Sequence, residues 1–77
     1  MSIDQSSILT KLNEGHAALW EHDWDGAVQA YNEALATTPD NDSALAGKGL
    51  ALFHQKRYTD SLRIFQELAH KNTNDPM

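Results

Sequence analysis

Apolar residues recur along the chain at steps of three and four, the spacing of one face of an α-helix. The chain shows no alternating apolar pattern and few β-branched residues, so strands are not favoured. Turn-forming residues cluster at positions 39–43 and 72–76. The pattern predicts four helices, at about 5–21, 24–37, 42–55 and 58–71. Ser6 or Ser7 is expected to cap the first helix, and Asn41 or Asp42 the third.

Two residues separate the first predicted helix from the second, and two separate the third from the fourth. Connections this short place neighbouring helices antiparallel. We therefore expect an all-α fold of two stacked antiparallel helix hairpins, which together form a single domain over residues 1–77.

The two hairpins repeat each other at an offset of 34 residues. Gly15 coincides with Gly49, and Tyr31 with Phe65. Glycine inside a helix costs about 1 kcal/mol relative to alanine, and close approach of a neighbouring helix is the gain that offsets this cost. Other pairs are alike in small, apolar or aromatic character: Ala17 with Ala51, Leu19 with Phe53, Trp24 with Tyr58, Ala27 with Ser61, Val28 with Leu62 and Ala34 with Leu68.

Each copy of the repeat also has a recognisable order of small, aromatic and turn residues. Repeat one (8–41) carries Gly15, Trp24, Ala27, Tyr31, Ala34 and Pro39, and repeat two (42–75) carries Leu45, Gly49, Leu52, Tyr58, Ser61, Phe65 and Leu68. This order resembles the tetratricopeptide repeat, a helix–turn–helix unit of 34 residues. Lys11, Glu14 and Lys48 depart from the family pattern, and Thr73 stands where its proline would fall. The resemblance implies a short right-handed solenoid that acts as a non-enzymatic scaffold or adaptor in protein–protein interactions.

The resemblance further implies that the first helix of each repeat lines a groove for a protein or peptide partner. Trp20 has two interpretations at this stage. It is either an anchor for the partner, because large aromatic rings dominate binding energy, or a core ring that covers the end of the hairpin. The residues expected to bind a partner in this first-helix groove are Leu9, Asn13, His16, Trp20, Leu50 and His54.

The last predicted helix has a wide apolar face but only one neighbouring helix to cover it. Repeat proteins bury each unit against the next, so part of this face is expected to stay exposed and to mark an interface. Its occupant is another protein, a second copy of the chain in a homodimer, or a later repeat of a longer array from which this chain is excised. The expected association face consists of Leu62, Ile64, Phe65 and Leu68.

Composition narrows the function further. The net charge of −5 argues against a nucleic-acid partner, and the lack of cysteine excludes disulfides and thiolate metal sites. The four histidines form no pair at helical i, i+4 spacing, and no catalytic motif occurs, so we expect no enzyme activity, metal or cofactor. Neither a signal peptide nor a membrane-spanning run is evident, so we expect a cytoplasmic protein without a membrane partner.

Overall fold

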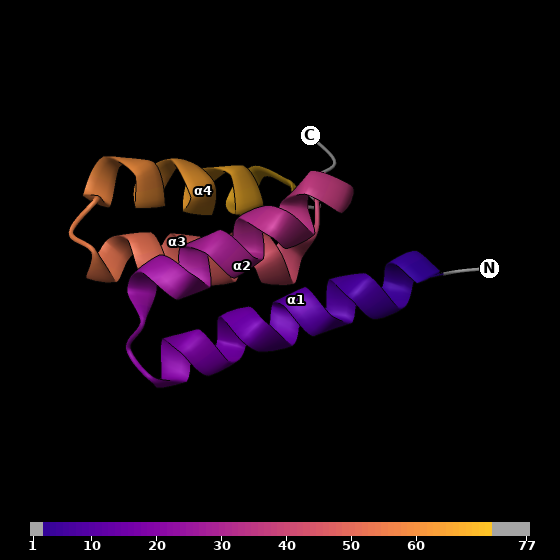
Figure 1. Cartoon of the computed structure of the whole chain (residues 1–77). Helices are drawn as coiled ribbons and strands as arrows, with labels where there is room; N and C mark the ends of the chain where they lie inside the picture. The colour runs from indigo at the N-terminus through magenta and orange to yellow at the C-terminus, as the bar shows by residue number, and fades with distance from the viewer. Residues whose placement is uncertain (1–2, 72–77) are drawn as a thin grey trace.

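Four helices form two hairpins that stack on each other. The computed structural model describes residues 3–71, with helices α1 (Ile3–Trp20), α2 (Trp24–Thr37), α3 (Asp42–His54) and α4 (Tyr58–Lys71). Helix α2 runs back along α1, and the α3–α4 hairpin lies beside it (Figure 1). The predicted all-α fold of two stacked hairpins is confirmed, and the helix boundaries differ from the predicted ones by at most two residues.

The start of α1 differs from the prediction. The helix begins at Ile3, so Ser6 and Ser7 lie inside it and neither caps it. Serine costs roughly 0.5 kcal/mol relative to alanine inside a helix. This cost is too small to end a helix against the good helix formers that follow, so the capping prediction was wrong.

The third helix starts as predicted. The Asn41 side-chain oxygen accepts a hydrogen bond from the Ala44 N–H at 2.9 Å, which confirms Asn41 as its cap. Helix α2 begins in the same way, because Asp23 accepts from the Gly26 N–H at 3.1 Å. Each cap satisfies one of the backbone donors that a helix leaves unpaired at its N-terminus.

The two hairpin turns share one backbone geometry. His22 (φ 62°) and Lys56 (φ 67°) both adopt the left-handed conformation, and they stand at equivalent positions of the two repeats. In the first turn the Asp23 N–H donates to the Ala18 carbonyl at 2.8 Å, and the corresponding bond in the second turn measures 2.9 Å. This pairing ends a helix sharply after a left-handed residue and turns the chain back on itself.

The core forms where α1 and α3 close on α2. Tyr31 is 0% exposed, and its ring lies between Gly15 of α1 and Gly47 of α3. A Cβ atom at Gly15 would lie 2.6 Å from this ring, so only glycine fits. The predicted close approach at this glycine is confirmed. Small residues complete the contact between the helices, namely Ala27, Ala34, Ala44 and Ala51.

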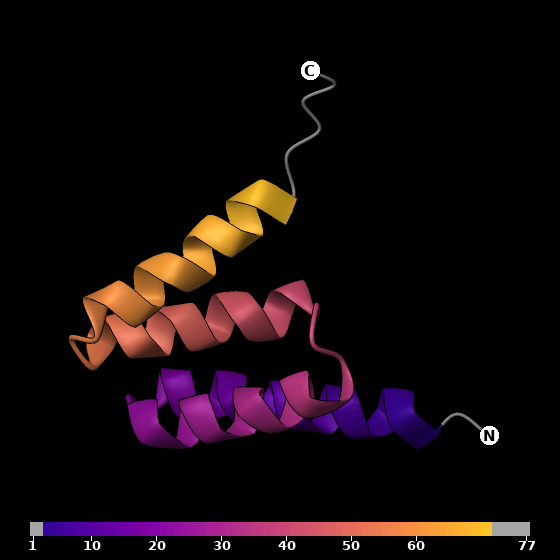
Figure 2. The same ribbon diagram turned by 90° about the horizontal axis from the view of Figure 1, so that it is seen from above.

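Helix α4 has fewer neighbours than α2. Within residues 3–71, α2 packs against both α1 and α3, whereas α4 packs against α3 alone. The Ser61 hydroxyl donates to the Gly49 carbonyl at 2.8 Å and fixes this contact. Figure 2 shows α4 inclined to α3, so that the two helices separate towards the end of α4. One side of α4 is therefore left uncovered.

Candidate protein-binding surfaces

An open apolar depression lies between α3 and α4. It has a volume of about 450 Å³, and its walls are almost entirely apolar. Tyr58 is 54% exposed, Leu62 56% and Phe65 40%. Exposed apolar side chains gathered in one hollow are typical of a binding surface. We call this surface the α3–α4 groove, and it is lined by Phe53, Tyr58, Ser61, Leu62 and Phe65.

The α4 wall of this groove follows the helix at steps of four, three and four residues. Tyr58, Leu62, Phe65 and Ala69 occupy these positions, and all four are exposed. At about 100° per residue they form one stripe along the helix. The same wheel places the charged side chains of α4 on the other side, away from the stripe. An uncharged stripe at this spacing is the kind of surface against which another helix packs.

Repeat one has an equivalent groove, and it is filled. Helix α3 packs against both α1 and α2 and covers the surface that corresponds to the α3–α4 groove. Tyr31 stands at the place of Phe65, and it is wholly buried where Phe65 is 40% exposed. The difference in exposure therefore comes from the covering helix, which has no counterpart over Phe65 among residues 3–71, because the two side chains have nearly the same size and position.

The structure divides the predicted association face in two. Leu62 and Phe65 line the α3–α4 groove, whereas Leu68 is half-buried. Ile64 is half-buried beside Gly49 and borders a hollow on the other side of α4, with Lys48 and Arg57. Leu62 and Phe65 thus share the groove with Tyr58 and Phe53, which the sequence-based set left out. The helical spacing that links Tyr58 to Leu62 and Phe65 in the sequence could have identified Tyr58 as part of this surface.

The residues predicted to line a first-helix groove lie at the surface of the protein. All six of them are exposed. Trp20 is 87% exposed, so it does not cover the core, and the interpretation as a core ring was wrong. Among the α1 residues whose side chains the structure describes, Trp20 is the most exposed of the large apolar ones.

Two histidines of the first-helix groove already have partners within the protein. The Tyr31 hydroxyl and His16 Nδ1 lie 2.5 Å apart and share a hydrogen bond. The His54 ring stacks on Trp24, with centroids 4.2 Å apart and planes inclined by 9°. Binding through either imidazole would have to compete with these contacts. The other four residues of the set make no such hydrogen bond or ring stacking with the described residues. They are Leu9, Asn13, Trp20 and Leu50.

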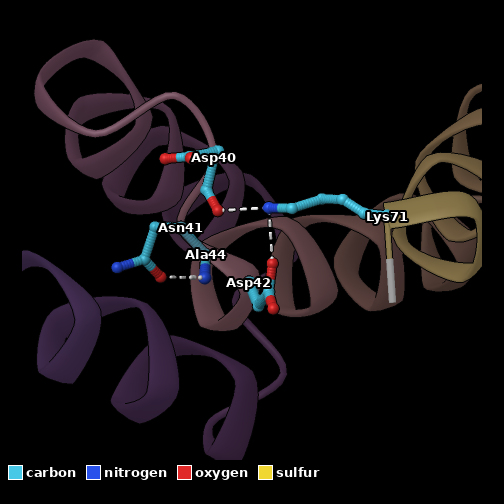
Figure 3. Close-up of polar contacts among 5 residues, drawn as sticks. All are labelled: Asp40, Asn41, Asp42, Ala44 and Lys71. Atoms are coloured by element: carbon cyan, nitrogen blue, oxygen red, sulfur yellow. Dashed lines mark hydrogen bonds and ion pairs between the residues drawn. The ribbon is translucent and has the colours of Figure 1, made fainter. Parts of the chain in front are cut away.

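A lysine ties the end of α4 to the loop before α3. Lys71 Nζ donates to the Asp40 carbonyl at 2.5 Å and to the Asp42 carboxylate at 2.6 Å (Figure 3). The hydrogen bond with Asp42 is the main cause that raises the pKa of Lys71 above its ordinary value. The pair is largely exposed to solvent, so its contribution to the stability of the fold is small.

Ionic contacts on α1 lie outside the α3–α4 groove. Lys11 Nζ lies 2.8 Å from the Glu33 carboxylate and 3.4 Å from that of Glu14. Hydrogen bonding with Glu33 raises the pKa of Lys11, and the same bond lowers the pKa of Glu33. The two residues stand on α1 and α2, so this exposed pair links the helices of repeat one.

Two further kinds of feature, metal-ligand clusters and membrane-spanning helices, are not found among the described residues. In the part of the chain that the structure describes, no three histidine or acidic side chains gather closely enough to hold a metal ion. Over the same residues, every helix is too short or too polar to cross a bilayer. What the described residues do present is exposed apolar surface on α1, α3 and α4.

Known proteins resemble this chain in sequence. The profile of a family described as tetratricopeptide repeat matches residues 12–76. The chain is similar to Protein CTR9 homolog of Arabidopsis thaliana, with 33% identity over 64 residues. This match spans 83% of the chain and 6% of that protein, so the chain corresponds to a small part of its relative. No solved structure matches the chain significantly.

Proposed function

Because the chain belongs to the tetratricopeptide-repeat family, whose members generally mediate protein–protein interactions, we propose that it binds a protein partner through the α3–α4 groove. The role is non-enzymatic. Binding is driven by burial of the partner's apolar surface against Tyr58, Leu62 and Phe65, which contributes roughly 25 cal/mol per Å² removed from water.

The observation that carries the proposal is the contrast in exposure between Phe65 and Tyr31. Phe65 is 40% exposed, and the equivalent Tyr31 is 0% exposed. Helix α3 covers Tyr31 but nothing in residues 3–71 covers Phe65 from the corresponding side. A surface that the fold fills in one repeat and leaves open in the next supports a role in docking.

The first-helix groove is a second candidate, supported by one observation. Trp20 is 87% exposed, and tryptophan is among the residue types enriched in side chains that dominate binding energy. A partner bound here would lie along α1 and α3, near Leu9 and Leu50. Self-association through the α3–α4 groove is the alternative to a separate partner, and it would make the chain a homodimer.

A peptide selection tests the proposal and separates the two surfaces. Random peptides are selected on the immobilised full chain, and the binding site of each selected peptide is mapped by amide chemical shifts. We expect shifts at Tyr58, Leu62 and Phe65. Peptides that map instead to Leu9 and Trp20 would place binding in the first-helix groove, and failure to select any binder would contradict the interaction role.

Two matched variants provide the control. Leu62→Asp and Leu9→Asp make the same chemical change at side chains that are 56% and 58% exposed, so both variants should fold. We expect Leu62→Asp to abolish binding of the selected peptides, while Leu9→Asp leaves it unchanged. Sedimentation equilibrium of the free chain, followed across concentration, decides whether a homodimer already fills the groove.

A further inference from the structure

A second hollow lies on the other side of α4 from the α3–α4 groove. It has a volume of about 300 Å³ and is lined by side chains of α2, α3 and α4. Helices α2 and α4 both pack on α3 but not on each other, so α3 forms the floor between them. We call this surface the outer hollow of repeat two, and its charged residues are Lys48, Arg57, Asp60 and Arg63.

The outer hollow of repeat two has more positive than negative side chains. Its one carboxylate, that of Asp60, lies 3.0 Å from the Arg57 guanidinium and pairs with it. Among residues 3–71, the side chains of Lys48 and Arg63 have no ion pair or hydrogen bond. Lys48 is half-buried, so its ammonium group has lost part of its contact with water and gained no counter-ion. Such a group favours an anionic ligand.

Repeat one has an equivalent hollow of opposite charge. This outer hollow of repeat one lies between α1 and α2, has a volume of about 500 Å³ and is lined mainly by acidic side chains. The offset of 34 residues pairs Lys48 with Glu14, Arg57 with Asp23 and Arg63 with Gln29. The same helix pairing thus carries opposite charge in the two repeats, and only the hollow of repeat two is suited to an anion.

Apolar side chains lie beside these cations. Val28, Leu52 and Ile64 line the same hollow, and a ligand that fills it buries apolar surface there as well as pairing its charge. We infer that the outer hollow of repeat two binds an acidic segment of another protein. A carboxylate of that segment pairs with Lys48 and Arg63, and a neighbouring apolar side chain contacts Ile64 and Val28. This surface is distinct from the α3–α4 groove, so the inference goes beyond the proposed function.

The surrounding charges select a compact anion over a nucleic acid. Asp25 and Glu33 line a depression that adjoins the hollow and shares Arg57 with it. These carboxylates, and the net charge of −5 of the whole chain, would repel a strand with a phosphate at every nucleotide. One or two carboxylates held at Lys48 and Arg63 meet less of this repulsion.

A following repeat would not fill this hollow. Helices α2, α3 and α4 already form its walls, and the surface equivalent to the one that α3 covers in repeat one is the α3–α4 groove, on the other side of α4. A second copy of the chain is a poor ligand, because its net charge of −5 opposes self-association. Its carboxylates in repeat one are also largely engaged, namely Glu14 and Glu33 with Lys11, Asp23 with the Gly26 N–H and Asp25 with Gln55.

A peptide library tests this inference on the full chain. Blocked peptides with a central pair of glutamates and random flanking residues are selected on the immobilised protein, and each selected peptide is also made with glutamine at the central pair. Fluorescence anisotropy measures binding, and amide chemical shifts locate it. We expect shifts at Lys48 and Arg63, and at least about tenfold weaker binding of each glutamine peptide.

Matched protein variants give the control. Lys48→Gln and Arg63→Gln should each weaken binding about tenfold, because each removes one charged hydrogen-bond donor. Lys56→Gln makes the same change of charge at an exposed lysine outside the hollow and should leave binding almost unchanged. Circular dichroism should show the same helix content in all three variants. Equal losses in Lys48→Gln and Lys56→Gln would overturn the site, because they would show attraction to net charge alone.

Other results would overturn the inference in distinct ways. If no glutamate peptide shifts Lys48 or Arg63, or if the glutamine peptides bind equally well, the hollow is not an acidic-segment site. Inorganic phosphate or a single-stranded oligonucleotide that binds there more tightly than the peptides would overturn a protein ligand. A concentration-dependent dimer that Lys48→Gln dissociates would show a second copy as the occupant. Leu62→Asp should not change binding here, so the α3–α4 groove stands or fails independently.

Discussion

Helices α2 and α4 hold equivalent places in the two hairpins, and their coverage differs more than their sequences do. Trp24, Val28 and Tyr31 of α2 correspond to Tyr58, Leu62 and Phe65 of α4. The three side chains of α2 are buried or half-buried, whereas those of α4 are all exposed. Helix α2 has a neighbour on each side, and α4 has α3 alone among residues 3–71. The same pattern of side chains is thus part of the core in one place and an exposed apolar surface in the other.

The difference shows that exposure in a repeat protein is set by neighbours as well as by residue type. Each repeat contributes one face to the next, so a repeat without a following neighbour leaves that face open. The exposed fractions of Phe65 and Tyr31 show this effect directly, because the two rings are close in size and stand at equivalent positions. Substitutions at equivalent positions should therefore cost different amounts of free energy in the two helices.

The largest expected difference comes from removing the two rings. Tyr31→Ala should lower the free energy of unfolding by about 3–5 kcal/mol, because the ring is fully buried. Phe65→Ala should cost about 1–2 kcal/mol, because much of its ring already contacts water. Urea denaturation followed by circular dichroism measures both. If Tyr31→Ala unfolds the chain outright, Tyr31→Leu and Phe65→Leu make the same comparison, and equal costs would break it.

Replacing Gly47 or Gly49 with alanine should show a smaller difference in stability between the contacts of α2 and those of α4. Gly47→Ala forces a methyl group against Tyr31, which α1 holds from the other side. Overpacking of this kind costs about 1–3 kcal/mol, and the gain in helix propensity offsets up to about 1 kcal/mol. Gly49→Ala meets the Phe65 ring at 2.9 Å, but that ring can move towards solvent. Thermal denaturation should therefore show a clear loss for Gly47→Ala and almost none for Gly49→Ala.

High pH should act on repeat one through Tyr31. Burial raises the pKa of its hydroxyl above the ordinary value of 10.0. Above about pH 10 the unfolded chain releases this proton while the folded chain retains it, so the free energy of unfolding falls as pH rises. Below the pKa that Tyr31 has in the unfolded chain, the contribution of this hydroxyl to the free energy of unfolding does not change with pH. Urea denaturation between pH 8 and about pH 11 should show a steeper decline for the natural chain than for Tyr31→Phe, and parallel declines would contradict this assignment.

The smallest expected effect lies in the turn that leads into α4. Lys56 has φ 67°, a conformation that costs a side-chain-bearing residue about 1 kcal/mol relative to glycine. Lys56→Gly should therefore raise the free energy of unfolding by about 0.5–1 kcal/mol. Lys56→Ala keeps the strain and removes the charge, so it should change stability little. A gain of equal size in both variants would point to the charge instead of the backbone.

Most of the fold follows from the sequence, because periodicity and turn residues report local structure directly. The spacing of apolar residues fixed four helices, and the glycines at 15 and 49 indicated close packing that the structure confirms. The start of α1 was missed because a serine pair satisfies a capping pattern without stopping a helix. A capping pattern does not indicate whether the residues before it are themselves helical.

The candidate site was predicted only in part, because a helical wheel gives a face but not the direction of the neighbour. Leu62, Ile64, Phe65 and Leu68 all lie on the apolar arc of α4, and only the position of α3 decides which of them stay open. Ile64 turned out to lie beside Gly49, whereas Tyr58 and Phe53 joined the groove. The stacking of His54 on Trp24 joins two repeats, and no local pattern predicts such a contact.

Amide hydrogen exchange of the full chain, with and without a peptide selected on it, tests the proposed docking role of the α3–α4 groove most directly. In the free chain, the amides around Phe65 should open at a lower free energy than the equivalent amides around Tyr31, because among residues 3–71 α4 has one covering helix and α2 has two. Saturation with the peptide should slow exchange in α4 and leave α2 almost unchanged. Equal protection of the two helices in the free chain, or an α4 that the peptide does not protect, would contradict the proposed role.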